Sequence, residues 1–400
     1  MESPEQPAFS ATSSWLVSSE ARPWFDWLST VDRQSLGTLT KLRNELSNDQ
    51  ASQLLQQLDL RERATRKFSQ AWQMFFSDIG LQQSTDEQIA TYKAARFPAG
   101  QKVADLCCGI GGDLIAIAQR CEVVAVDASD DHLCFAEANV HAYGAKLADR
   151  HCGLAEETSL ADFAAWHIDP DRRPEQTRTI RLDQFRPSLE HLEAMLQQNP
   201  NAALKLAPAN AIPADWEEAG QCEWISNHRE CKQLMVWLGN LTDRPGTRRA
   251  TRIDGNGQAT CFEDSLVELK QSAAVDTYLF DPDPALVASG LVDALAARHD
   301  LVRVSAQSHY LTGGQPLDHP LLQRFEVITQ EKIDNKRLKK AVATEDWGTL
   351  ELKQRGLELK LETWRKQLKP RGKGQGTIIF TPTVEGNRAI LCRRPATTGA

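Results

Sequence analysis

The pattern of hydrophobic positions changes near residue 100 of this 400-residue chain. Before that point, large apolar side chains recur three and four positions apart, which is typical of amphipathic helices. We therefore predict a helical N-terminal domain of about four to six helices over residues 22–98. Residues 1–21 are rich in Ser, Pro, Glu and Ala and are predicted to be disordered. The helical pattern includes the segment 68–76 and the residues Leu39, Leu42, Leu46, Leu54, Leu55 and Leu58.

After residue 100, short apolar runs alternate with helical patterns. The runs 103–106 and 123–127 are each followed by a helical pattern, over 114–120 and 130–143. Strands and helices that alternate at this pace predict βαβ units and a parallel sheet. An α/β domain is therefore expected over residues 99–318. Its other expected elements are a helix at 285–298, a turn-rich hairpin or linker at 243–257, and strands at 163–168, 202–206, 222–225, 233–238 and 277–281.

The end of the chain mixes strand and helix patterns in a short space and carries a different charge. From Leu321 onward it has 17 Lys and Arg against 9 Asp and Glu, a net charge of +8, whereas the whole chain carries −8. A basic tail on an acidic body suggests a polyanionic partner, although a solvated helix surface would give the same composition. We predict a small α+β domain over 319–397, with helices at 334–343 and 361–368 and strands at 326–329, 350–353, 376–380 and 388–392.

Composition also sets the expected compartment. No run of eighteen apolar residues is present, so we expect no membrane span. The first twenty residues lack the basic start and apolar stretch of a signal peptide, which leaves the cytoplasm as the expected location. The nine cysteines are scattered, without the C-x-x-C spacing of a zinc or redox site. We therefore expect reduced thiols and no bound metal.

A glycine-rich turn between the first strand and first helix of the α/β domain is the strongest chemical signal. It is the run Asp105-Leu-Cys-Cys-Gly109-Ile-Gly111-Gly112-Asp113, in which glycines let the backbone turn sharply and approach a ligand. A dinucleotide site would need a third glycine at position 114, which is leucine. An S-adenosylmethionine site has no pyrophosphate to hold and needs an acid at the end of the strand, where Asp105 lies.

A second acid supports the same cofactor. Asp127 ends the second strand, where a carboxylate accepts hydrogen bonds from both ribose hydroxyls; a solvated aspartate is the alternative. Glu156, or the backbone near Ala155, is the candidate for contact with the adenine amine. The predicted cofactor-binding residues are therefore Asp105, Cys107, Gly109, Gly111, Asp127 and Glu156.

These motifs carry a family resemblance. The run Asp105-Leu-Cys-Cys108-Gly109-Ile-Gly111 resembles the nucleotide-binding loop of class I RNA methyltransferases, particularly the trimethylguanosine synthase group. The similarity includes 83–93 and 138–144, and in that group a helix comparable to 83–93 before the core helps to close the cofactor pocket. The whole chain is similar to class I methyltransferases with a C-terminal THUMP-like domain, through 169–173, 278–284, 310–313 and 350–356. The resemblance implies a Rossmann-like core and a tail related to domains that present RNA to the enzyme.

The end of the fourth strand is the expected reaction site, because substrates bind outside the carboxyl ends of the strands. Enzymes that methylate exocyclic amines have Asp, Asn or Ser here, then two prolines and an aromatic residue. This chain has Asp169 and Pro170 but then Asp171 and Arg172, which departs from that pattern. Asp169 is our candidate for orienting the nucleophile and Asp171 the second candidate, as a general base. Arg172 and Arg173 are candidates for stacking on a base or holding a phosphate; a structural ion-pair network is the alternative.

Two further sets of residues have open interpretations. Lys205 lies within an apolar strand and either points into the crevice or extends to the surface. Trp347 and Trp364 are expected to pack in the core rather than stack on a base. In the tail, the predicted contacts with RNA phosphates are Lys336, Lys340, Arg355, Arg371 and Lys373.

The sequence thus predicts a cytoplasmic S-adenosylmethionine-dependent methyltransferase that acts on RNA, either tRNA or rRNA, through its THUMP-like tail. Its predicted parts are a helical N-terminal domain, a Rossmann-like core and a THUMP-like α+β domain. Two other functions stay open at this point. One is methylation of a protein or a small molecule, and the other is a non-catalytic protein that binds the cofactor and RNA.

Overall fold

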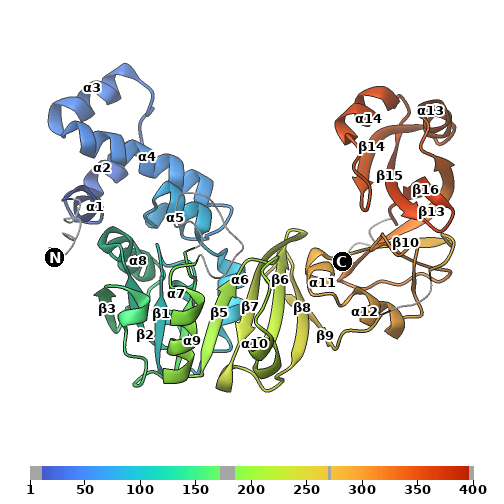
Figure 1. The fold of residues 1–400 in the computed structure, drawn as a ribbon. Helices are drawn as coiled ribbons and strands as arrows, with labels where there is room; N and C mark the ends of the chain where they lie inside the picture. Colours follow the sequence, from blue (N-terminus) through green and yellow to red (C-terminus); the bar gives the residue numbers. More distant parts are fainter. Residues whose placement is uncertain (1–10, 172–184, 269–271, 396–400) are drawn as a thin grey trace, which may run out of the picture. The chain divides into compact units, whose positions relative to one another are not determined.

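The computed structural model describes residues 11–171, 185–268 and 272–395. The chain forms two compact units. The first consists of Met1–Gln221 and Leu234–Gly246, and the second of Cys222–Gln233 and Thr247–Ala400. Figure 1 labels the helices and strands in chain order.

The first unit begins with helices, as the hydrophobic spacing predicts. Ser47 and Gln50 form reciprocal hydrogen bonds that cap the start of one of them, and its Leu54 and Leu58 are buried. These helices are α1 (Ala11–Leu16), α2 (Arg22–Leu28), α3 (Leu36–Glu45), α4 (Asn48–Ala64), α5 (Asp78–Gln83) and α6 (Glu87–Ala94), with the short 3-10 helix η1 (Ala71–Gln73).

Two segments differ from the prediction. Part of 1–21, predicted to be disordered, forms α1, because Leu16 is buried there despite the polar composition; residues 1–10 lie outside the described part of the chain. In the segment 68–76, only η1 is helical. The Asn139 side chain donates to the Phe75 carbonyl at 2.9 Å and accepts from the Phe75 N–H at 2.7 Å. The N–H and carbonyl of Phe75 are therefore bonded to Asn139 and are not available for the backbone hydrogen bonds of a helix.

A mainly parallel sheet follows the helices (Figure 1). Its neighbouring strands β3, β2, β1, β4 and β5 are parallel, and β7 is antiparallel to β5. Their bounds are β1 (Lys102–Leu106), β2 (Glu122–Asp127), β3 (Asp149–Cys152), β4 (Ala165–Ile168), β5 (Ala202–Leu206) and β7 (Glu230–Trp237). Strands β4 and β5 are buried along their whole length, as in sheets covered on both faces. This is the predicted Rossmann-like arrangement.

Helices connect these strands. Both α7 (Leu114–Ala118) and α8 (Asp130–Ala142) contact β2, and α8 also contacts β3. The remaining helices of this region are α9 (Leu189–Gln198), α10 (Ala214–Ala219), η2 (Ala155–Glu157) and η4 (Gly239–Leu241). Successive β–α connections bring the carboxyl ends of β1, β2 and β4 to one edge of the sheet, which is the edge where the predicted site residues lie.

Strand β6 (Gln221–Asn227) leads into the second unit, where β8 (Thr247–Ile253) and β9 (Ala259–Asp264) form an antiparallel pair. This pair confirms the hairpin among the two interpretations of 243–257. The expected helix at 285–298 is instead two helices, α11 (Pro284–Ala288) and α12 (Val292–Arg298). The break lies at Gly290, whose φ of 77° does not continue a helix.

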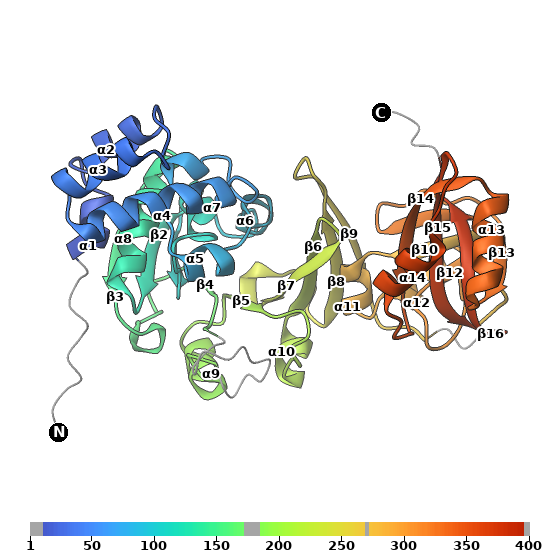
Figure 2. The same cartoon turned by 90° about the horizontal axis from the view of Figure 1, so that it is seen from above.

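A seven-stranded sheet of the second unit has the order β11-β12-β10-β13-β16-β15-β14. Strands β14 and β15 are parallel, and the other described pairs are antiparallel. The bounds are β10 (Tyr278–Pro282), β11 (Val302–Arg303), β12 (Leu311–Gly313), β13 (Leu322–Lys332), β14 (Trp347–Gln354), β15 (Gly374–Thr383) and β16 (Gly386–Arg393). Lys353 of β14 reaches Asp281 of β10 although three strands lie between them, so the sheet is strongly curled (Figure 2).

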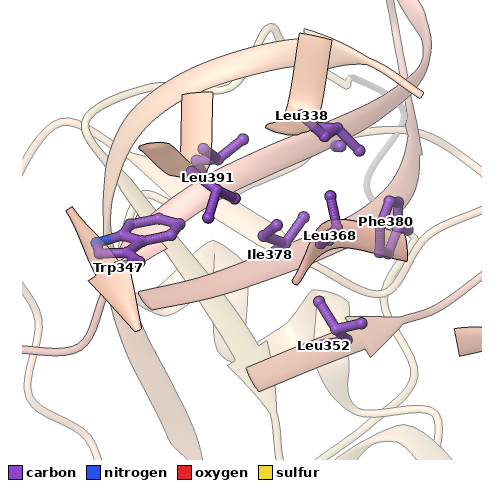
Figure 3. Packing of buried hydrophobic residues seen from close by; sticks show 9 residues of the cluster. Leu338, Trp347, Leu352, Leu368, Ile378, Phe380 and Leu391 are labelled. Atoms are coloured by element: carbon purple, nitrogen blue, oxygen red, sulfur yellow. The ribbon is translucent and has the colours of Figure 1, made fainter. Parts of the chain in front are cut away.

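The curled sheet has a separate core on each face. Side chains alternate along β15, so Ile378 and Phe380 join one core and Ile379 the other. Helices α13 (Asn335–Thr344) and α14 (Leu361–Leu368) cover the first core, which contains Trp347 (Figure 3). Trp364 packs against it too, which confirms the core interpretation of both tryptophans.

Two expectations about composition can be compared with the structure. Within the described ranges, no helix is long and apolar enough to cross a membrane. The cysteines are free in the described part of the chain.

Candidate active site

The glycine-rich run forms a tight loop between β1 and α7. Cys107, Gly109 and Gly111 all have positive φ, of 54°, 54° and 91°, which explains the glycines at two of these positions. The N–H of Gly109 donates to Oδ2 of Asp127 at 2.8 Å. A side chain added at Gly109 would meet no atom within 4 Å, so the loop offers open backbone to a ligand.

Carboxylates gather around this loop. Burial raises the pKa of the Cys107 thiol, and the negative charges of four nearby carboxylates raise it further. They are the predicted site residues Asp127, Asp169, Glu156 and Asp105. S-adenosylmethionine carries positive charge on its sulfonium and its ammonium group, so a carboxylate-rich loop with open backbone at Gly109 fits this cofactor.

Asp105 and His167 form a buried pair. They are register partners on the neighbouring strands β1 and β4, so their side chains point to the same face. Nδ1 of His167 lies 2.6 Å from Oδ1 of Asp105, and both residues are 1% exposed. Burial raises the pKa of Asp105, opposed by the charge and hydrogen bond of His167. Oδ2 of Asp105 has no hydrogen-bond partner among the described residues and is the oxygen left for the predicted contact.

Two buried lysines share Asp113, the last residue of the glycine-rich run. Nζ of Lys93 lies 2.6 Å from Oδ1, and Nζ of Lys205 lies 3.5 Å from Oδ2. The Thr85 hydroxyl donates to Oδ2 at 2.6 Å. Burial alone would raise the pKa of Asp113, but the charges of Lys93 and Lys205 outweigh it and hold the pKa well below its usual range. Asp113 is therefore an anion that anchors both cations.

Lys205 links this pair to the predicted reaction site. Its Nζ lies 2.5 Å from Oδ2 of Asp169 and donates to the Thr85 hydroxyl at 2.8 Å. The lysine is buried, which decides between the two interpretations of Lys205: the side chain points into the site. Asp169 follows β4 directly, and its side chain is 25% exposed. The carboxylate is thus held on one side and open on the other.

The segment before the core lies against the glycine-rich loop. A side chain added at Gly112 would come within 2.8 Å of the Thr85 nitrogen. Lys93 belongs to the helix α6 that follows Thr85. Residues 83–93 therefore supply two members of the buried network, in the position that the family resemblance implies for a closing helix.

Comparisons with known proteins agree with this geometry. The family model "RNA cap guanine-N2 methyltransferase" matches residues 100–170, and the model "THUMP domain-like" matches residues 322–394. Two curated Mycobacterium tuberculosis proteins, from strains CDC 1551 and H37Rv, are described as uncharacterized S-adenosylmethionine-dependent methyltransferases. Each is 29% identical over 362 residues, which cover 86% of this chain and 98% of the relative. The protein is an S-adenosylmethionine-dependent methyltransferase.

A solved structure supports the fold of the methyltransferase along almost its whole length. The crystal structure of a candidate methyltransferase from Porphyromonas gingivalis W83 superposes with a TM-score of 0.79 at 19% sequence identity. It covers 97% of this chain and 99% of the other. The Rossmann-like core and the THUMP-like C-terminal domain are therefore the architecture of this methyltransferase.

Asp171, Arg172 and Arg173 are the remaining predicted residues of the reaction site. Asp171 is exposed, and its backbone forms two hydrogen bonds with Arg186, of 2.9 and 3.0 Å. Its role as a general base stays a prediction. Arg172 and Arg173 lie outside the described residues, so their predicted contacts with a base or phosphate stay predictions as well.

The predicted RNA contacts of the methyltransferase fall into two groups. Lys336 and Lys340 are exposed on α13, and Arg371 and Lys373 are exposed on the loop before β15. None of these four forms an ion pair with another described residue. Arg355 differs, because its guanidinium lies 2.9 Å from the buried Asp281.

Sequence reasoning missed several members of the buried network. His167 lies between apolar residues of a buried strand, and Lys93 lies on the same helix face as Ile89 and Ala90. A charged or titratable side chain at a position where the pattern calls for an apolar one is the signal that would have found both. Nothing in the spacing shows that Asp113 and Lys205 meet, because 92 positions separate them.

Proposed function

We propose that this methyltransferase transfers the methyl group of S-adenosylmethionine to RNA. The observation that carries the proposal is the set of exposed cations on α13 and on the loop before β15, which form no ion pair with any described residue and lie within the THUMP-like residues 322–394. Cations of this kind bind phosphates without reading sequence. The match of residues 100–170 to a family described as RNA cap guanine-N2 methyltransferase supports the same substrate class.

The basic surface proposed for RNA consists of Lys336, Lys340, Arg371 and Lys373. The backbone brings their segments together, since the N–H of Gly374 donates to the carbonyl of Asp346, two residues after α13. Neighbouring phosphates along an RNA backbone can therefore meet cations from both segments.

The proposed chemistry is an in-line displacement at the sulfonium, which requires a positioned nucleophile and an acceptor for its proton. We assign the orienting role to Asp169, because the Lys205 ammonium fixes one oxygen and the side chain stays partly exposed. A carboxylate held in this way accepts a hydrogen bond from an amine or hydroxyl of the substrate. Asp171 is the second candidate for the proton acceptor. Asp105, Cys107, Gly109, Gly111, Asp127 and Glu156 are the proposed cofactor contacts.

The test uses methyl-radiolabelled S-adenosylmethionine, the full-length protein and a host lysate from a strain that lacks the gene. Labelled product is digested with RNase or with protease. We expect label that is lost with RNase, and loss of labelling with Asp169→Ala at unchanged cofactor binding. Protease-sensitive label would replace the proposal with a protein substrate. No macromolecular label would contradict it and favour a small-molecule substrate or a non-catalytic protein.

A further inference from the structure

Three cationic side chains surround one buried carboxylate in the second unit. Asp281 lies in β10 and is 1% exposed. Its oxygens lie 3.1 Å from Arg229, 2.7 Å from Lys353 and 2.9 Å from Arg355. One carboxylate neutralises one cation, so this cluster carries an excess of two positive charges.

The excess charge is accessible. The side chains of Arg229, Lys353 and Arg355 are 30%, 20% and 24% exposed, whereas the carboxylate between them is buried. Cations held this close repel one another. The repulsion is stronger than it would be in bulk water, because the effective dielectric constant near a protein surface is lower. An anion placed against the exposed side of the cluster would relieve that repulsion. A phosphate is the suitable anion, since guanidinium groups bind its oxygens in pairs.

The backbone holds one of the three cations, Arg229, in an unusual conformation. His228 and Arg229 form the turn after β6 with φ of 49° and 58°, a region that non-glycine residues rarely adopt. Turns of this type normally contain Asn-Gly. The chain instead places Arg229 there, where its guanidinium reaches Asp281. Strain at non-glycine residues is typical of functional positions.

The backbone at Arg355 is also fixed, by hydrogen bonds and by close packing. Its N–H donates to the Phe380 carbonyl at 3.2 Å, and its own carbonyl accepts from the Thr381 hydroxyl at 3.2 Å. Gly356, next in the chain, has φ of 71°, and a side chain there would come within 2.6 Å of the Gln307 carbonyl. The cluster is therefore organised before any ligand arrives.

A buried polar group also lies beside the cluster. Tyr310 is 0% exposed, and the guanidinium carbon of Arg355 lies 5.8 Å from the centre of its ring. Burial raises the pKa of Tyr310, and Arg355 opposes this rise through its charge and a hydrogen bond. Tyr310 therefore holds Arg355 from the buried side of the cluster.

We propose that Arg229, Lys353 and Arg355 form a phosphate-binding site, with Asp281 as the buried counter-charge that holds the three cations in place. The phosphate is part of an RNA backbone or a free phosphate compound. This site goes beyond the proposed methyl transfer, because it lies wholly in the second unit and needs neither the cofactor nor Asp169.

The experiment titrates inorganic phosphate into the full-length protein, without cofactor, by isothermal calorimetry at constant ionic strength. Arg229→Asn removes one cation, and asparagine tolerates positive φ better than most residues, so this variant should fold. We expect phosphate to bind about tenfold more weakly to it and to Arg355→Gln. Asp281→Asn removes the competing negative charge, and we expect it to bind phosphate at least as tightly as the parent. Arg43→Gln, which removes an exposed cation on α3 far along the chain from the cluster, is the control and should leave the titration unchanged.

A competition experiment then identifies the source of the phosphate. A short single-stranded RNA that displaces inorganic phosphate from the parent assigns the site to the RNA backbone, and an RNA that does not displace it assigns a free phosphate compound. The proposal is overturned if the parent binds no phosphate, or if Arg229→Asn and Arg355→Gln titrate like the parent. The cluster would then be an internal ion-pair network. Neither result depends on methyl transfer, so failure here is distinct from failure of the proposed function.

Discussion

Replacement of Asp113 by asparagine should destabilise the methyltransferase by an amount that the structure sets. The Asp113 carboxylate lies 2.6 Å from Nζ of Lys93, and the Met235 sulfur lies 3.8 Å from the same nitrogen. The Lys93 side chain is 2% exposed, so water cannot take the place of the carboxylate. Removal of one partner of a buried ion pair costs roughly 3–5 kcal/mol, because the other charge stays buried without compensation. We expect Asp113→Asn to lower the free energy of unfolding by about that amount.

The reciprocal change should cost less. Lys93→Met leaves Asp113 with Lys205 and the Thr85 hydroxyl, so we expect a loss of only about 1–2 kcal/mol. The double variant should be close to Lys93→Met alone, because no lone buried charge remains. Urea unfolding of the full chain, followed by the fluorescence of the buried Trp166 and Trp237, measures all three. The reasoning is refuted if Asp113→Asn costs less than Lys93→Met.

The same carboxylate predicts acid sensitivity. The pKa of Asp113 in the folded protein lies well below its usual value, because the charges of Lys93 and Lys205 outweigh the effect of burial. A group of this kind contributes its full stability above the pKa of the unfolded chain, about pH 4, and loses it as the pH falls. The unfolding free energy of the parent should therefore fall more steeply below about pH 4 than that of Asp113→Asn. Equal slopes for the two proteins would contradict this account.

Three further changes test other parts of the molecule. Asp127→Ala should weaken S-adenosylmethionine binding by about tenfold in calorimetry, since it removes the predicted ribose acceptor and the partner of the Gly109 N–H; unchanged affinity would remove Asp127 from the site. Gly376→Ala should lower the unfolding free energy by about 1–3 kcal/mol, because its new methyl group would overlap the Trp347 ring, whereas Gly37→Ala meets no atom and serves as the control. Lys336→Glu combined with Lys340→Glu should weaken RNA binding in fluorescence anisotropy and reduce its salt dependence, and an unchanged salt slope would place RNA elsewhere.

The sequence predicts the buried parts of the fold better than its edges. Strands β2 and β5 are apolar along almost their whole length, so their bounds match the predicted runs. Strand β3 lies at the edge of its sheet, with polar, largely exposed residues Asp149–Cys152, and leaves no apolar pattern to find. In β8, Arg248, Arg249 and Arg252 are half-buried and use their side chains in tertiary contacts. The sequence of this strand is therefore as charged as that of a linker.

The candidate site could also be predicted only in part from the sequence. A motif of consecutive residues, such as Asp105 to Asp113, can be found in the sequence because its geometry is local. The pairing of Lys205 with Asp169 depends on how β4 and β5 align, and the approach of Lys93 depends on how α6 packs on α7. Such contacts arise from tertiary structure, and local spacing does not contain them.

The buried network gives a physical reason for a helical segment before the methyltransferase core. The orienting role proposed for Asp169 requires a fixed carboxylate, and Nζ of Lys205 lies 2.5 Å from one of its oxygens. Lys205 in turn lies between Asp169 and the Asp113–Thr85 pair, and Asp113 is kept ionised largely by Lys93. Thr85 and Lys93 precede the first strand of the core. The pre-core segment therefore contributes charge and hydrogen bonds to the proposed reaction site, and a core without residues 83–94 would lose the contacts of Thr85 and Lys93 with Asp113.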